Sequence, residues 1–405
     1  MKKGQYDIII VGGGMVGSAI ACALGGSRYS VAVLENQYPA PFSFEQPHDL
    51  RVSAISVASE TLLRNVGAWE GITSRRLCPY RRMKVWESDA DKAATEFNST
   101  DINEPYLGNI VENRIVQLAL LERLSEFDNV DLLCPVKTQS IDYSPGSSIV
   151  TLEDGQELIG RLLIGADGGS SNVRQAAGIG VTQWDYAQHA LIASVKTAYP
   201  QQDITWQQFT PTGPLAFLPL SGSHASLVWY NTPNDVKRLL ALDDDAFNRA
   251  LHEQFPSCLG KIDAILERGF FPLRRQHAHR YVDDGVALVG DAAHMIHPLA
   301  GQGVNIGFLD AAAISACLLD AQDQQDFYSM AWLARYEKER RHPNLLMMQS
   351  MDFFYRAFSN RILPIKLLRN IGLGVAGRLP FAKEHVMRLA MGIEGQLPEL
   401  SRRFG

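Results

Sequence analysis

Two short apolar runs, residues 6–11 and 30–35, flank a stretch with helical spacing at residues 15–25. Neither run alternates apolar with polar residues, a pattern typical of parallel strands that are buried on both faces. A glycine-rich turn joins the first run to the helical stretch. The chain is therefore predicted to begin with a strand-helix-strand (βαβ) unit.

The middle of the chain has the pattern of antiparallel strands. Residues 81–88 alternate like a strand, and strand-like runs recur between residues 190 and 229. Two further runs, 149–152 and 157–164, are separated by an Asp-Gly turn and predict a hairpin. We expect an antiparallel sheet built largely from this part of the chain.

Helical spacing returns at three other places, residues 56–65, 111–126 and 304–319. A second strand-to-helix crossing is expected around residues 286–291, and the remainder of the chain reads as mostly helical. The pattern contains no internal repeat.

Composition narrows the classes of function. With 405 residues, of which 46% are hydrophobic, the chain can bury two or three cores. The net charge of -6 gives no basic footprint, so nucleic acid is a poor candidate as a partner. Five scattered cysteines indicate neither a disulfide framework nor a zinc site, and we expect no metal.

No signal peptide is expected, since residues 1–7 are polar and the apolar run 8–11 ends in glycines. We also expect no stretch of roughly 18 uncharged apolar residues that could span a membrane. A cytoplasmic protein follows, with a peripheral position on the inner membrane as an option.

The first chemical motif is the sequence Gly-x-Gly-x-x-Gly at Gly12, Gly14 and Gly17. It lies between a buried strand and a helix, and Glu35 stands at the end of the next strand. Glycines allow a tight turn and close approach of the backbone to a pyrophosphate at the helix N-terminus, and the acid accepts hydrogen bonds from ribose hydroxyls. The motif predicts dinucleotide binding but does not choose between FAD and NAD.

Two later motifs each place an aspartate after a strand. Asp167 lies in Gly-Ala-Asp-Gly, and Asp291 in Gly-Asp-Ala-Ala-His, which leads into a Pro-Leu-Ala-Gly-Gln-Gly-Val-Asn loop and a helix. A carboxylate can bond a polyol hydroxyl, and a helix N-terminus can stabilise a reduced, anionic flavin. One such aspartate would more often be a cap or turn residue. Two of them, in this order after the first motif, favour FAD.

Together these motifs resemble the class A flavoprotein aromatic hydroxylases related to para-hydroxybenzoate hydroxylase. Within that group, residues 51–56, 111–113 and 297–305 resemble the ubiquinone-biosynthesis hydroxylases, and the similarity covers nearly the whole chain. The resemblance implies an α/β fold, with a Rossmann-like FAD-binding domain, an inserted antiparallel-sheet substrate domain and a helical C-terminus. The predicted divisions are a discontinuous FAD-binding domain at 1–78, 100–180 and 272–345, a substrate domain at 79–99 and 181–271, and a C-terminal region at 346–405.

The resemblance also implies roles for single residues. The FAD diphosphate would lie on Gly12, Gly14 and Gly17, near Arg51, with the adenosine ribose on Glu35 and the ribitol on Asp291. Asp167 would brace both FAD and the visiting nicotinamide cofactor. The isoalloxazine would face Gly301, Gly303 and Asn305. Many relatives carry arginine where this chain has Asn113, and Gln117, one turn later, is the candidate substitute.

The implied reaction is a ring hydroxylation. NAD(P)H would reduce FAD, O2 would form a flavin hydroperoxide, and its distal oxygen would pass to the ring of a polyprenyl benzoquinol. We assign no catalytic base, because His294 and His297 at a strand-helix junction more often make structural hydrogen bonds. Candidate substrate contacts are Phe217, Leu218, Pro219 and Pro298, although aromatic residues on strands are by default core residues.

Several alternatives stay open. A prenyl reductase or epoxidase of the same superfamily would share the FAD motifs, and so would an enzyme that hydroxylates a different ring position. A non-enzymatic flavoprotein would bind FAD but never consume NAD(P)H. The basic amphipathic stretch at residues 361–391 could rest on anionic lipid, on another ubiquinone-biosynthesis protein, or on the body of the protein itself.

Overall fold

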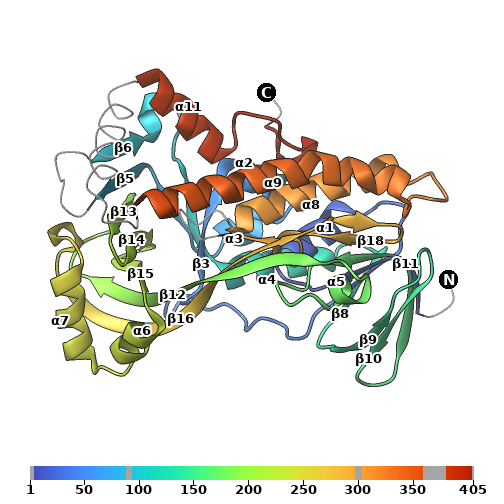
Figure 1. Cartoon of the computed structure of the whole chain (residues 1–405), viewed down its shortest axis with the longest axis horizontal. Helices are drawn as coiled ribbons and strands as arrows, with labels where there is room; N and C mark the ends of the chain where they lie inside the picture. Colours follow the sequence, from blue (N-terminus) through green and yellow to red (C-terminus); the bar gives the residue numbers. More distant parts are fainter. Residues whose placement is uncertain (1–3, 88–93, 297–302, 359–379, 404–405) are drawn as a thin grey trace.

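The computed structural model describes residues 4–87, 94–296, 303–358 and 380–403. Figure 1 shows two sheets at opposite ends of an elongated molecule, with long helices along one side. The mixed α/β architecture agrees with the fold predicted from the sequence.

A mainly parallel sheet contains the predicted βαβ opening. Strands β1 (Gln5–Val11) and β2 (Val31–Leu34) pair in parallel, and helix α1 (Met15–Ala23) connects them. The full order is β17-β18-β11-β1-β2-β8. The remaining members are β8 (Val130–Leu133), β11 (Glu157–Gly165), β17 (Val282–Asp283) and β18 (Val286–Leu288). Because both faces of β1 and β2 are buried, their apolar runs do not alternate.

The predicted hairpin is confirmed and extends this sheet. Strand β10 (Ser148–Leu152) pairs antiparallel with β11, and β9 (Thr138–Asp142) pairs with β10. The turn between β10 and β11 contains Gly155 at a φ of 83°. Glycine adopts that left-handed conformation without the steric cost that other residues pay.

Helices cover the parallel sheet. Helix α1 packs against both α4 (Asn113–Leu124) and α8 (Gly303–Asp320), and α8 packs against α9 (Met330–Phe358). Shorter helices are α2 (Val57–Asn65), α3 (Trp69–Thr73) and α5 (Asn172–Ala176). The predicted helix at 111–126 begins two residues later than expected, because Val111 and Glu112 belong to a strand.

That strand is part of a small third sheet that sequence reasoning missed. Strand β7 (Gly108–Glu112) pairs with both β3 (Val52–Ser56) and β4 (Cys78–Tyr80). All of β7 is buried, so it shows no alternation that could separate it from the helix that follows.

The antiparallel sheet expected in the middle of the chain is present. Its order is β19-β16-β12-β15-β14-β13-β5-β6, and all neighbours are antiparallel except β13 and β5. The strands are β5 (Arg82–Glu87), β6 (Thr95–Asn98), β12 (Val181–Thr197), β13 (Ile204–Thr210), β14 (Gly213–Leu220), β15 (His224–Asn231), β16 (Ile262–Ala278) and β19 (His294–Met295). Strands β12 and β16, of 17 residues each, run from this sheet toward the parallel sheet (Figure 1).

Each large sheet has its own core. One face of the antiparallel sheet packs on α6 (Pro233–Leu240) and α7 (Asp244–Gln254), with Trp206 and Phe217 among the buried side chains. The core of the parallel sheet lies between its strands and α1, α4 and α8. The opposite face of the antiparallel sheet remains available to line a site.

Short helical turns and a last helix complete the described ranges. They are η2 (Ser99–Ile102), η3 (Ser257–Leu259), η4 (Gly290–Ala292), α11 (Pro380–Met391) and η6 (Glu399–Ser401). Within these ranges, α8 alone is long and apolar enough to cross a membrane, but 67% of that stretch is buried inside the protein. Core helices commonly satisfy the same criterion, so α8 is weak evidence for a membrane span.

Candidate flavin and substrate site

The glycines of the first motif differ in what surrounds them. A Cβ atom at Gly12, where φ is 108°, would lie 2.4 Å from the carbonyl oxygen of Ala166. At Gly17 it would lie 2.0 Å from the carbonyl oxygen of Gly12. At Gly14 no atom lies within 4 Å. The protein's own packing therefore explains Gly12 and Gly17, whereas Gly14 leaves room for something else.

That room lies at the N-terminus of α1. Gly14 is the N-cap residue, no side chain caps the helix, and its first turn carries no acid. The backbone N–H groups and the helix dipole there favour an anion. The geometry fits a diphosphate at the place that the sequence predicted.

Glu35 and Gln117 both lie beside this turn. A Cβ atom at Gly13 would come within 2.8 Å of the Glu35 Cβ, so the acid stands against the glycine turn. One Glu35 carboxylate oxygen accepts hydrogen bonds from the backbone N–H groups of Asn36 and Gln37. The Gln117 amide donates to the carbonyl oxygen of Gly13 at 3.0 Å, and thereby holds the turn.

Asp167 caps a helix with one carboxylate oxygen, while its other oxygen has no partner among the described residues. Its Oδ2 accepts from the backbone N–H groups of Asn172 and Val173 and so caps α5. Its Oδ1 is buried and reaches no partner among the described residues. Nearby, the Arg174 guanidinium donates to the carbonyl oxygens of Gly169 and Ala292, both at 2.8 Å, and joins the second motif to the third.

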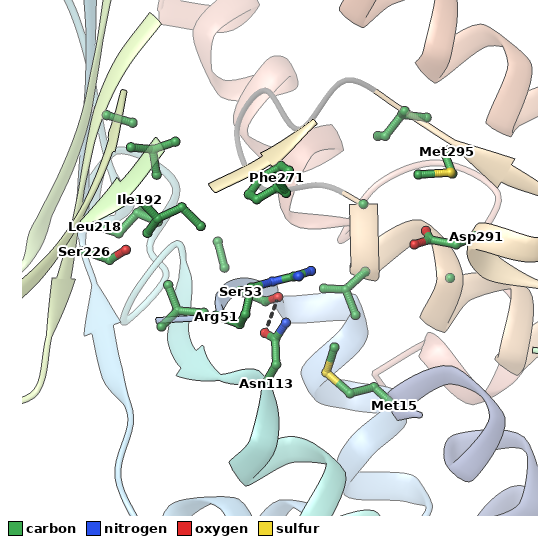
Figure 2. A pocket seen from close by; sticks show the side chains of 18 of the residues that line it. Met15, Arg51, Ser53, Asn113, Ile192, Leu218, Ser226, Phe271, Asp291 and Met295 are labelled. Carbon is green, nitrogen blue, oxygen red and sulfur yellow. Dashed lines mark hydrogen bonds between the residues drawn. The ribbon is translucent and has the colours of Figure 1, made fainter. Parts of the chain in front are cut away.

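Asp291 lies in η4 and faces a cavity (Figure 2). Its carboxylate is open to that cavity but lies deep in the molecule, and it forms no hydrogen bond with the described residues. Burial raises the pKa of this carboxyl, while His294 and Arg51 act in the opposite direction. An acid that faces a cavity without a partner suits a ligand that carries hydroxyl groups.

A buried polar network holds the loop that carries Asp291. Asp310 on α8 accepts from the backbone N–H of Gly290 at 3.1 Å, from His294, and from Arg340 of α9 at 3.0 Å. Asn344 also donates to it, at 2.9 Å. His294 is 2% exposed and bonded to Asp310, which supports the structural role over a proton-transfer role.

The third motif is only partly described. Gly303 begins α8 and lines the cavity, with open space where its Cβ would stand. The Asn305 side chain is buried and bonds Ala54, Ser56 and Ser59, so it ties α8 to β3 and α2. His297, Pro298 and Gly301 lie outside the described residues.

The cavity has a volume of about 410 Å³ and two chemically different ends. At one end lie Gly14, Arg51, Gly303 and Asp291. The Arg51 guanidinium lies 5.5 Å from the Phe271 ring centroid and forms no ion pair with a described residue. The other end is a mainly apolar wall of the antiparallel sheet.

Strand alternation decides which predicted substrate residues reach that wall. Leu218 lines the cavity, as Figure 2 shows, but Phe217 and Pro219 do not. The Phe217 ring stacks on Trp206, with 5.4 Å between centroids, in the core under α6 and α7. Neighbouring residues on a strand point to opposite faces, so the three residues could not all face one cavity.

Other cavity residues were missed or underrated in the sequence. Ser53 and Asn113 lie opposite the sheet wall, and the Ser53 hydroxyl donates to the Asn113 side-chain oxygen at 2.7 Å. Ser226 and Gln207 contribute polar side chains to the wall itself. Only the period-two pattern of the strands could have pointed to these two residues.

Comparison with known sequences places the chain among flavoproteins. Residues 5–350 match the family model described as an FAD binding domain. The chain is 42% identical to 3-demethoxyubiquinol 3-hydroxylase of Escherichia coli K12, over 97% of this chain and 100% of that protein. It is 37% identical to a mitochondrial ubiquinone biosynthesis monooxygenase of Xenopus tropicalis, over 95% and 93% of the two chains.

Solved structures share the fold. p-Nitrophenol 4-monooxygenase PnpA of Pseudomonas putida superposes with a TM-score of 0.78 at 17% identity, covering 96% of this chain and 98% of that one. PqsL of Pseudomonas aeruginosa, a probable FAD-dependent monooxygenase, gives 0.75 at 22% identity, covering 91% and 99%. At these identities the likeness establishes the fold alone.

Proposed function

Because this chain belongs to the FAD binding domain family and is an FAD-dependent monooxygenase, we propose that it hydroxylates the ring of a polyprenyl benzoquinol intermediate of ubiquinone biosynthesis. NAD(P)H and O2 are the co-substrates. The observation that carries the proposal is the two-ended cavity, in which residues suited to FAD face an apolar wall suited to an aromatic ring.

The residues present fit FAD. The uncapped N-terminus of α1 and the open space at Gly14 would take the diphosphate, with Arg51 nearby as a cation. Glu35 would bind the adenosine ribose, and the unpartnered Asp291 carboxylate would bind the ribitol. When bound, FAD supplies the reductive activation of O2 and the transfer of one oxygen atom.

The chain itself contributes position and water exclusion. Among the described cavity residues none is a histidine, and Asp291 is the only carboxylate. A quinol ring is already electron-rich, so it needs orientation more than it needs a strong base. Ile192, Leu218 and Val228 give the wall an apolar surface against which a ring can pack without water.

The choice of substrate rests on similarity. Residues 39–42, 206–211 and 351–355 resemble demethoxyubiquinol hydroxylases, and the 42% identical relative carries that name. A prenyl reductase or epoxidase, or a hydroxylase of another ring position, would keep the same flavin residues and differ in the wall. Product analysis separates these alternatives.

The polyprenyl tail also motivates a proposal about location. A long isoprenoid chain partitions into a bilayer, so the enzyme would meet its substrate at the inner membrane from the cytoplasmic side. Other ubiquinone-biosynthesis proteins are the expected partners there. Residues 359–379, which include most of the basic amphipathic stretch, lie outside the described residues, so support comes from the substrate chemistry.

Purified protein tests the proposed function directly. We expect a yellow protein that oxidises NAD(P)H faster when a short-tailed demethoxyubiquinol analogue is present. Mass spectrometry should find substrate plus one oxygen. A yellow protein that yields no oxygenated product from this analogue would contradict the proposed substrate and leave the flavoprotein assignment intact.

A further inference from the structure

The cavity wall is one face of the antiparallel sheet, and its side chains alternate with those of the core. Ala216 and Leu218 on β14 face the cavity, as do Ser226 and Val228 on β15, with Ile192 on β12. Leu218 and Ser226 are directly paired across the two strands. Ser226 is therefore a hydroxyl group beside aliphatic side chains of the wall (Figure 2), and its cross-strand neighbour on β12 is Ser194.

The Ser226 hydroxyl has no hydrogen-bond partner. The residue is 1% exposed, and its Oγ reaches no donor or acceptor among the described residues. Thr205, which also lines the wall, donates its hydroxyl to the carbonyl oxygen of Phe217 at 2.8 Å. A buried hydroxyl normally finds such a partner, because losing water without replacement costs free energy. Ser226 therefore lacks a partner that a ligand in the cavity can supply.

The position of Ser226 indicates which atom of a ligand would form this hydrogen bond. Ser226 stands on the wall that faces Arg51, Ser53 and Asn113, so anything between them lies between the sheet and the flavin end (Figure 2). A hydroxyl can donate to or accept from an oxygen substituent of an aromatic ring. Among the residues that line the cavity, the neighbours of Ser226 on β14 and β15, Leu218 and Val228, are aliphatic, so one hydrogen bond to Ser226 would fix how the ring is turned.

We propose that Ser226 is the specificity-determining residue that binds an oxygen substituent of the substrate ring and so decides which ring carbon faces the flavin. This inference rests on the proposed ring hydroxylation and deepens it. Without the hydroxyl, the ring would still enter the apolar wall but would lie there in more than one orientation.

The chain provides a matched control in Ser194. It pairs directly with Ser226 across β12 and β15, is fully buried, and also has an unpartnered hydroxyl. It does not line the cavity. Ser194→Ala therefore removes a neighbouring hydroxyl from the same face of the sheet, but not from the residues that line the cavity.

A binding experiment tests the hydrogen bond independently of turnover. FAD-loaded protein is titrated with a 4-alkylphenol and with the matching alkylbenzene, and the flavin spectrum reports binding. The wild type and Ser194→Ala should prefer the phenol by about tenfold, the effect of one hydrogen bond. Ser226→Ala should lose most of that preference. Ser226→Thr should keep the preference while Ser226→Val, of the same shape, loses it.

A product experiment tests the ring orientation. With the short-tailed demethoxyubiquinol analogue, Ser226→Val should give several-fold less hydroxylated product per NAD(P)H oxidised than the wild type, or a mixture of ring isomers. Ser226→Thr and Ser194→Ala should give the single wild-type isomer.

Several outcomes would overturn the inference. It fails if the wild type does not prefer the phenol, if Ser226→Val keeps that preference, or if Ser194→Ala loses it equally. Failure of the proposed substrate looks different: the wild type then yields no hydroxylated quinol, while the phenol preference persists and still depends on Ser226.

Discussion

The glycines at this site are required for different reasons, some by the packing of the protein itself and others by the space for a ligand. Gly12 and Gly17 are needed wherever the turn folds, since a Cβ atom would strike backbone atoms of Ala166 or of Gly12 itself. Gly14 and Gly303 face open space. Nothing in the described protein explains the absence of a side chain there, so these two glycines point to a ligand.

Exchanging these glycines separates folding from cofactor binding. Gly14 has φ -69° and ψ -175°, which alanine adopts readily, so Gly14→Ala should leave the Tm of the apoprotein nearly unchanged. Its methyl group should weaken FAD binding by about tenfold or more. Gly17→Ala should lower the Tm with or without FAD. Flavin fluorescence measures the FAD affinity. If Gly14→Ala binds FAD as tightly as the wild type does, Gly14 does not contact FAD.

Asp291 should stabilise the holoprotein but destabilise the apoprotein. Burial raises the pKa of this carboxyl, so its charged form is disfavoured in the fold. A raised folded-state pKa means that the cost is present at neutral pH and disappears as pH falls through that pKa. Because the carboxylate is exposed to the cavity and solvent screens its charge, Asp291→Asn should raise the apoprotein Tm at pH 7 by about 1 °C or less, and this gain should vanish in acid.

The same variant should bind FAD less tightly, because an amide is a weaker acceptor for ribitol hydroxyls than a carboxylate. Thermal unfolding against pH and an FAD titration measure the two effects. A variant less stable than the wild type at pH 7 would show that Asp291 has a partner within the protein.

At the scale of elements, helices α8 and α9 are joined by two ion pairs of different kinds. Asp310 and Arg340 are almost fully buried, at 0% and 4% exposure of their side chains. Asp320 and Arg335 pair on the same two helices, but their side chains are 59% and 54% exposed. The buried pair lies under the Gly290 turn, whereas the exposed pair lies at the far end of α8.

Removing the two acids should have unequal effects. Asp310→Ala leaves Arg340 and His294 buried without their acceptor and should lower the free energy of unfolding by about 3–5 kcal/mol. Asp320→Ala should cost about 1 kcal/mol or less. Denaturant unfolding measures both. Equal losses in the two variants would contradict the distinction between buried and exposed pairs.

The stability that the Asp310 network contributes should also be lost in acid. Burial acts to raise the pKa of Asp310, but His294 and Arg340 lower it further than burial raises it, so the net shift is downward from 3.8. A lowered folded-state pKa contributes stability above the unfolded value, and that stability is lost as pH falls below it. The loss with Asp310→Ala should therefore shrink at pH values below about 3.8.

At the scale of the whole molecule, the cavity collects residues from both large sheets and from the small third one. Arg51 and Ser53 come from the β3 region, Asp291 follows β18, and Ser226 lies on β15. FAD would contact Arg51 and Asp291, whereas the substrate would contact Ser226. Binding of FAD should therefore be coupled to folding of the parallel sheet and of the small third sheet.

This coupling predicts a large effect of FAD on stability. FAD at 100 times its dissociation constant should add about 2.7 kcal/mol, because it binds the folded chain alone. Differential scanning fluorimetry of apoprotein with and without FAD gives the shift in Tm. Riboflavin, which lacks the diphosphate, should give a smaller shift at equal concentration. Equal shifts would contradict a diphosphate site at α1.

The sequence alone was enough to predict the βαβ opening, the β10-β11 hairpin and the antiparallel middle, because these features depend on local periodicity and on residues that are close along the chain. FAD was predicted from three motifs in a fixed order along the chain, and the hydroxylation from the family resemblance. The predicted site residues Gly14, Arg51, Asp291 and Gly303 share one cavity in the structure. Their roles toward FAD remain predictions.

Only the tertiary structure decided which side chains meet. The phase of β14 put Leu218 in the cavity and Phe217 in the core, and the pairing of β15 with β14 placed the Ser226 hydroxyl beside Leu218. Asp310 joined His294 to Arg340 only because α9 packs on α8. Such contacts depend on strand register and helix packing between segments far apart in the chain, which local patterns do not specify.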